Sequence, residues 1–268
     1  MTVHVSGAAA DAVARHVPAL VASKFASRLG DGDATLWGGA AEPEASIRLG
    51  WVHASAVSRP LVPEILAFRG ELIARGLTRV VLCGMGGSSL APEVITRTAG
   101  VDLVVLDSTH PTQVSRVLDE AIEETVVVVS SKSGSTAETD SQKRAFEGAF
   151  VAAGIDPTTR IVIVTDPGSP LDVASREAGY RVFNADPTVG GRYSALTAFG
   201  LVPSGLAGVD IAGLLDEADA ALPLFEEHCH DVAWEIGSAH VGAHPSPRGT
   251  DAASANRSAH TAFVSSVA

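Results

Sequence analysis

The chain has 268 residues, a formal net charge of −12 at pH 7 and 46% hydrophobic residues, enough apolar material for the core of one large domain or two modest ones. The negative charge, which no basic stripe offsets, argues against nucleic acid and anionic membranes as partners. No apolar run reaches the roughly 20 residues that a membrane helix needs, and charged residues interrupt the N-terminal apolar stretch before a signal-peptide core could form. We therefore expect a soluble, cytoplasmic protein.

The first part of the chain, residues 1–76, is expected to be mainly helical. It holds at least two helical segments, which the Gly-rich stretch 30–39 separates. We expect this part to form an N-terminal helical extension packed on an α/β core.

Five short apolar runs predict the strands of a parallel sheet. They are residues 79–83, 103–106, 126–129, 161–164 and the weaker 180–183. Each is apolar on both faces and rich in β-branched residues, as the central strands of a parallel sheet are. Because segments of helical spacing lie between them, the pattern predicts an α/β fold. We expect a three-layer αβα sandwich with a parallel five-stranded sheet, in a domain spanning residues 77–205.

The two cysteines, Cys83 and Cys229, are too few for a disulfide framework and lack the spacing of a metal site. Cys83 ends an apolar run, so we expect a buried, reduced thiol there. We expect neither a metal nor a cofactor.

Two regions follow the sheet. An amphipathic helix is expected from about residue 209 to 234, within a C-terminal segment at 206–236. Residues 237–268 contain no Leu, Ile, Met, Lys or Glu and keep no regular period. This composition is typical of a disordered tail and also of an out-of-frame reading of GC-rich DNA, and both interpretations predict no packed structure there.

A first candidate ligand loop, Gly-Met-Gly-Gly-Ser-Ser-Leu at residues 84–90, follows the first strand. Glycines let the backbone approach a ligand closely, and the next helix offers free N–H groups to an anion. Ser89 stands where the dinucleotide fingerprint Gly-x-Gly-x-x-Gly needs its last glycine. Alone, the pattern suits many ligands.

In a second loop, residues 130–139, the first seven positions place five hydroxyls and one lysine between an all-Val strand and the next helix. Ser135 and Glu138 fit a capping box, which would make this a well-capped helix start. Capping needs one hydroxyl and one carboxylate, however. The excess of hydroxyls favours a phosphate site, since a phosphate accepts hydrogen bonds from hydroxyls and from a helix N-terminus together.

A third loop, residues 189–194, contains two glycines followed by Arg192. The glycines bring the backbone in close, and the arginine supplies a fixed cation. Without further context, an arginine after a turn is commonly just solvated.

Together the three loops resemble the glucose-6-phosphate isomerase family. Residues 84–90 are similar to its GIGGS-x-L turn, with Met for Ile, and residues 190–194 are identical to its GGRYS signature. Residues 131–139 are similar to its SK-T-x-T-T-x-E-T segment and to the wider sugar-isomerase (SIS) consensus S-x-S-G-x-T-x-E. The motifs keep the family's order, so residues 79–203 resemble its N-terminal SIS domain.

The resemblance implies a phosphate-binding role for the second loop. Ser131, Ser133 and Thr136, aided by the Lys132 backbone, would hold the phosphate of glucose or fructose 6-phosphate. Glu138 corresponds to a family carboxylate, which we assign to helix capping and loop order.

The other two loops would serve the sugar. By the same resemblance, Gly86 and Ser88 border it, and Arg192 lies against the enediolate that forms during aldose–ketose interconversion. A cation fixed beside a developing negative charge lowers such a barrier.

The sequence also departs from the family. Its members continue into a second SIS domain, which carries the glutamate that moves the proton between C2 and C1 and the histidine and lysine that assist ring opening. Those motifs do not occur here, and a solvated helix face better explains Glu226, Glu227, His228 and His230. Losing a general base costs a factor of about 10² to 10⁴ in rate. We therefore expect a truncated chain that is inactive alone, whose full-length relatives are homodimers.

Three functions compete. The leading one is isomerisation of glucose 6-phosphate and fructose 6-phosphate, with a hexose 6-phosphate as the ligand. An alternative is a non-catalytic sugar-phosphate-binding SIS module of the kind found in transcription regulators, but the sequence shows no basic helix-turn-helix segment and GGRYS belongs to the isomerases. A third, the isomerase half of an amidotransferase that makes glucosamine 6-phosphate, requires a second SIS repeat.

Overall fold

The computed structural model of the chain describes residues 6–227. Two compact units divide them: residues 53–215 form one, and residues 6–52 with 216–227 contribute to the other. The expected boundaries at residues 76, 205 and 236 stay predictions, and the expected tail at 237–268 lies outside the described residues. No helix within 6–227 is both long enough and apolar enough to cross a membrane.

A five-stranded parallel sheet organises the larger unit, as the sequence predicted. Its strands are β1 (Arg79–Gly84), β2 (Val104–Leu106), β3 (Thr125–Ser130), β4 (Ile161–Thr165) and β5 (Arg181–Asn184). They pair in the order β2-β1-β3-β4-β5, and every pairing is parallel. β3 is buried at all six positions, because helices cover both faces of the sheet.

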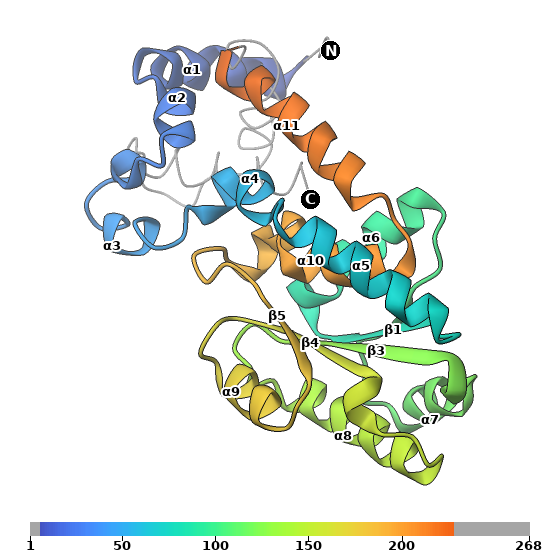
Figure 1. The fold of residues 1–268 in the computed structure, drawn as a ribbon. Coiled ribbons are helices and arrows are strands. Elements are labelled where there is room, and N and C mark those ends of the chain that lie inside the picture. Colours follow the sequence, from blue (N-terminus) through green and yellow to red (C-terminus); the bar gives the residue numbers. More distant parts are fainter. Residues whose placement is uncertain (1–5, 228–268) are drawn as a thin grey trace. The chain divides into compact units, whose positions relative to one another are not determined.

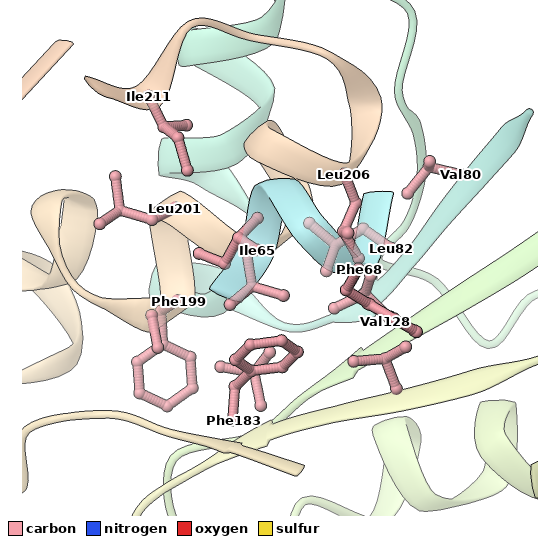
Figure 2. Close-up of a cluster of buried hydrophobic side chains, with 14 of the residues drawn as sticks. Ile65, Phe68, Val80, Leu82, Val128, Phe183, Phe199, Leu201, Leu206 and Ile211 are labelled. Atoms are coloured by element: carbon pink, nitrogen blue, oxygen red, sulfur yellow. The ribbon is translucent and has the colours of Figure 1, made fainter. Parts of the chain in front are cut away.

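The first face of the sheet is covered by α5 (Leu61–Ala74), α6 (Leu90–Ala99) and α10 (Ala198–Ala207) (Figure 1). Alternate strand residues such as Leu82 and Val128 point to this face, where they meet Ile65 and Phe68 of α5 and Leu201 of α10 (Figure 2). This cluster is the largest apolar core of the unit.

The second face is covered by α7 (Pro111–Asp119), α8 (Ala137–Ala152) and α9 (Pro170–Glu177) (Figure 1). The intervening strand residues, among them Val127 and Val129, pack there against Phe146 and Phe150 of α8. Cys83 is fully buried in this layer as a free thiol, as predicted, and burial raises its pKa. The three-layer αβα sandwich is therefore confirmed.

α10 was not predicted from the sequence as a separate helix. Residues 198–206 are buried all round it, so no polar face marks a helical period. Short 3₁₀ turns complete the unit: η3 (Gly86–Ser88), η4 (Ile122–Glu124), η5 (Pro157–Thr159) and η6 (Gly191–Leu196). α4 (Ala54–Ser58) precedes α5.

The smaller unit is helical. It contains α1 (Ala8–Ala22), α2 (Phe25–Gly30), η1 (Ala34–Trp37) and α3 (Glu42–Ala45), and η2 (Gly50–His53) ends at its border. Its core includes Leu20 and Leu36 and an edge-on contact between Phe25 and Trp37, whose ring centroids lie 5.9 Å apart. α11 (Ile211–Glu227) begins in the larger unit, where Ile211 and Leu215 are fully buried. The remainder of the helix predicted to residue 234 lies outside the described residues.

The sheet has a topological switch point between β1 and β3. The chain leaves β1 through α6 on the first face and leaves β3 through α8 on the second, although the two strands are neighbours. Ligands of open α/β sheets bind at such a point, outside the carboxyl ends of the strands. The fold therefore directs attention to the loops after β1 and β3.

Candidate sugar-phosphate site

The first two candidate loops leave the sheet at the same level. Gly84 at the end of β1 pairs with Ser130 at the end of β3. A Cβ on Gly84 would lie only 3.3 Å from the Ser130 oxygen, so the two loop beginnings are in close contact. The parallel register thus brings residues 84–89 and 130–136 to one edge of the sheet, although they lie about 45 positions apart in sequence.

The first and third loops are packed against each other. A Cβ at Gly87 would lie 2.4 Å from the Gly191 oxygen, a distance that only glycine permits. Ser194 supports the contact, because its Oγ lies 2.8 Å from the Gly191 oxygen and 3.5 Å from the Gly87 oxygen. Gly86 has a φ of 57°, which also favours glycine. Gly86 and Ser88 are therefore held on a surface that GGRYS shares.

In the second loop, the hydroxyl groups bond to one another. The buried Ser131 donates from its Oγ to Thr136 Oγ1 at 3.1 Å. Ser133 Oγ accepts from the Ser135 N–H at 3.3 Å and from the Ser135 hydroxyl at 3.1 Å. These bonds fold residues 131–136 into a compact turn that carries hydroxyls on both sides of Gly134.

Gly134 fixes the position of this turn. Its φ is 68°, and a Cβ there would lie 2.9 Å from both Cβ and N of Leu171 and 3.0 Å from Ser169 Oγ. The turn therefore presses directly on the start of α9. Ser131 N also donates to the Val164 oxygen at 3.0 Å, which extends the pairing of β3 with β4 by one residue.

The predicted capping box is wrong. Thr136 is the N-cap of α8, in an extended conformation, and no side chain of the described residues caps this helix. Because the helix begins one residue later than a Ser135 cap requires, Glu138 occupies the second helical position instead of the third. The exposed Glu138 is thus not the capping carboxylate that we expected, and the first N–H groups of α8 have no side-chain acceptor within the described chain.

Lys132 forms an ion pair across the carboxyl edge of the sheet. Its Nζ lies 2.6 Å from Asp166 Oδ2 and 3.4 Å from the backbone oxygen of Pro187. Asp166 was not recognised from the sequence. The available signal was its place directly after β4, beside the loop that carries the lysine.

Arg192 lies in η6 with an exposed side chain, and its guanidinium has no hydrogen bond or ion pair with the residues described. Burial raises the pKa of the neighbouring Tyr193 phenol, and the positive charge of Arg192 opposes that shift. Arg192 therefore belongs to the surface formed by the first and third loops, with a side chain free to meet an anion. In the described part of the chain, no group of three or more His, Cys, Asp or Glu is placed to hold a metal.

Comparison with known proteins bears on this arrangement. The phosphoglucose isomerase family model matches residues 67–232, more than half of the chain and a range that contains all three loops. The chain belongs to the phosphoglucose isomerase family.

Curated relatives carry the same name. A probable glucose-6-phosphate isomerase of Haloarcula marismortui is 39% identical over 140 residues, which are 51% of this chain and 32% of that protein. The glucose-6-phosphate isomerase of Geobacter sp. strain M21 is 38% identical over 152 residues, 53% of this chain and 29% of that protein. The chain thus aligns with about a third of the length of these phosphoglucose isomerase relatives.

Solved structures agree on the fold. A hypothetical protein of Thermus thermophilus superposes with a TM-score of 0.70 and 29% identity, covering 85% of this chain and 53% of that one. A glucose-6-phosphate isomerase of Chlamydia trachomatis has a TM-score of 0.60 and 25% identity, covering 74% of this chain and 39% of that one. The family resemblance stated from three loops therefore extends over most of the chain.

Proposed function

We propose that this member of the phosphoglucose isomerase family binds a hexose 6-phosphate at the β1/β3 switch point and serves the interconversion of glucose 6-phosphate and fructose 6-phosphate. The observation that carries the proposal is the loop before α8. It combines the hydroxyls of Ser131, Ser133 and Thr136 with a helix start that no described side chain caps. Hydroxyls and unpaired backbone N–H groups are the donors that a phosphate accepts from.

The sugar would extend from this phosphate toward the surface formed by the first and third loops. Gly86 and Ser88 border it there. The Arg192 guanidinium stabilises the enediolate, because a fixed cation beside developing negative charge lowers the barrier to its formation. Proton transfer between C2 and C1 needs a general base, and the sequence lacks the family motif that carries one. A polypeptide of these 268 residues would therefore bind the sugar phosphate without isomerising it at a useful rate.

A titration and a coupled assay test the proposal together. Fructose 6-phosphate and 6-phosphogluconate should bind in calorimetry, unphosphorylated fructose should not, and a coupled assay should show no useful turnover. Equal affinity for fructose with and without phosphate would contradict the phosphate site. Turnover near that of ordinary isomerases would contradict the expectation that these residues supply no general base.

Arg192→Ala tests the assignment of the third loop. Its loss of affinity should be larger for an enediolate mimic such as 5-phosphoarabinonate than for fructose 6-phosphate, because Arg192 is assigned to the reacting carbons. Equal losses for both ligands would place Arg192 at the phosphate instead. The cytoplasmic location, the exclusion of nucleic acid and the homodimeric state of full-length relatives stay predictions.

A further inference from the structure

The ammonium group of Lys132 is engaged by residues outside its own loop. It contacts Asp166, which follows β4, and the backbone oxygen of Pro187, which follows β5. The side chain therefore crosses two neighbouring connections at the carboxyl edge of the sheet. The Lys132 and Asp166 side chains keep only 23% and 19% of their surface exposed, so solvent screens this ion pair less than one on an open surface.

Other contacts hold the same loop against the connection from β4 to α9. Gly134 presses on Leu171 and Ser169, and Ser131 N bonds to the Val164 oxygen. Ser169 is itself held by Thr165, whose Oγ1 lies 2.8 Å from Ser169 Oγ. The loop is thus packed against a segment that has hydrogen bonds of its own, and the ion pair of Lys132 with Asp166 is the charged contact between the two.

We propose that Asp166 is a positioning residue for the phosphate loop. It holds the Lys132 ammonium, so the lysine fixes the position of the loop and does not contact the phosphate. The phosphate is bound by hydroxyls and backbone N–H groups. This inference rests on the proposed function, because it concerns how the same phosphate is held. A site of this kind depends on the fixed geometry of its donors more than on the charge of the lysine.

Calorimetric titration of fructose 6-phosphate at low and high salt tests the proposal with four variants: Asp166→Asn, Asp166→Glu, Lys132→Met and the double variant Asp166→Asn/Lys132→Met. Each of the two single losses, Asp166→Asn and Lys132→Met, should weaken binding about tenfold, and the double variant should be no worse than either, because all three remove one shared interaction. Asp166→Glu keeps the carboxylate and should restore most of the affinity. The salt dependence of Lys132→Met should match that of the parent, since the lysine charge does not meet the phosphate.

Glu147→Gln provides a matched control. It removes another partly buried Lys–carboxylate pair, Lys143 with Glu147, which lies further along α8. This variant should bind fructose 6-phosphate as the parent does. The opposite pattern would overturn the proposal: unchanged or tighter binding by Asp166→Asn, with a weaker salt dependence in Lys132→Met, would show a lysine that contacts the phosphate directly.

Hydrogen exchange of the unliganded protein separates this inference from the proposed function. Asp166→Asn should accelerate amide exchange across residues 131–137, while Glu147→Gln should not. Unchanged exchange in Asp166→Asn would refute the positioning role of Asp166, whether or not a sugar phosphate binds. If exchange were accelerated in Asp166→Asn but the parent protein did not bind fructose 6-phosphate, the proposed function would be refuted. The role of Asp166 in positioning the loop would still hold.

Discussion

α8 and α9 begin at equivalent places in the fold but in different ways. They follow the neighbouring parallel strands β3 and β4 and cover the same face of the sheet. At α9, Ser169 Oγ accepts from the Asp172 N–H at 3.0 Å, and the Asp172 carboxylate accepts from the Gly168 N–H at 2.8 Å. At α8, the N-cap Thr136 makes no side-chain capping bond.

The difference separates a structural helix start from one suited to a ligand. The N-terminal N–H groups of a helix need acceptors, and α9 obtains them from its own side chains. The first N–H groups of α8 remain available to another acceptor, and the hydroxyls of Ser131, Ser133 and Thr136 lie in the loop just before them. This difference in capping is the reason for proposing the phosphate site at the start of α8 and not at the start of α9.

The largest expected effect comes from the contact that joins the two helix starts. Gly134→Ala places a Cβ 2.9 Å from the Leu171 backbone nitrogen at a φ of 68°. Strain and overlap together should lower the free energy of unfolding by about 3 kcal/mol, and the displaced loop should lose its affinity for sugar phosphate. Urea denaturation and calorimetric titration measure the two losses.

Gly148→Ala, in the middle of α8, is the control for that change. A Cβ there meets nothing within 4 Å, so alanine should stabilise the protein by about 0.5–1 kcal/mol through its helix propensity. Gly134→Ala with parental stability and affinity would show that the loop does not depend on its support by α9.

Binding should distinguish the two helix starts next. Ser131→Ala, Ser133→Ala and Thr136→Ala should each weaken fructose 6-phosphate binding by about 1–3 kcal/mol, the usual contribution of a hydrogen bond to a charged group. Ser169→Ala removes the cap of α9 and should weaken that affinity clearly less than these three changes, because Ser169 meets the loop only through its packing against Gly134. Ser141→Ala, on the exposed surface of α8, is a further hydroxyl control. If the Ser131, Ser133 and Thr136 variants bound fructose 6-phosphate as tightly as the parent, the phosphate would lie elsewhere.

Stability should show the reverse order. Ser169→Ala should lower the free energy of unfolding by about 1–2 kcal/mol, because the Asp172 N–H loses its acceptor. Thr136→Ala should cost clearly less, since its side chain does not cap α8. Thermal melts of the two variants at one pH make the comparison. A larger loss in Thr136→Ala would mean that α8 is capped in solution after all.

The sequence predicted the sheet and its loops well and the helix starts poorly. Five short apolar runs with β-branched residues, separated by helical segments, are typical of a parallel sheet, and parallel strands place their following loops at one edge. The capping box was assigned to Ser135 and Glu138 at α8, whereas the structure has a side-chain cap at Ser169 of α9 and none at α8. A shift of one residue turns a side chain by about 100° around the helix, and sequence patterns rarely fix a helix start that closely.

Two other features could not be predicted from local pattern. Asp166 pairs with Lys132 because β3 and β4 are neighbours, and the order of strands is a property of the whole fold. α10 is buried on every side, so it lacks the polar face by which a helix is recognised. Both belong to the surroundings of the site, where tertiary contacts decide the structure.

The smallest expected effect is a pH dependence of stability to which the start of α9 contributes and the start of α8 does not. The Gly168 N–H, together with Asn184 and Arg176, holds the pKa of the Asp172 carboxyl below its usual value. Because the folded pKa is the lower one, this carboxylate stabilises the protein above the unfolded pKa of about 4 and loses its contribution as the pH falls through the folded value. Asp172→Asn should therefore destabilise the protein at pH 7 and much less at pH 3, so that its unfolding midpoint in urea varies less with pH than the parent's. Glu138→Gln, at the start of α8, should leave the parental pH dependence in place, because that exposed carboxylate caps nothing. The opposite result, in which Glu138→Gln reduced the pH dependence of stability and Asp172→Asn did not, would mean that α8 and not α9 has the capped start.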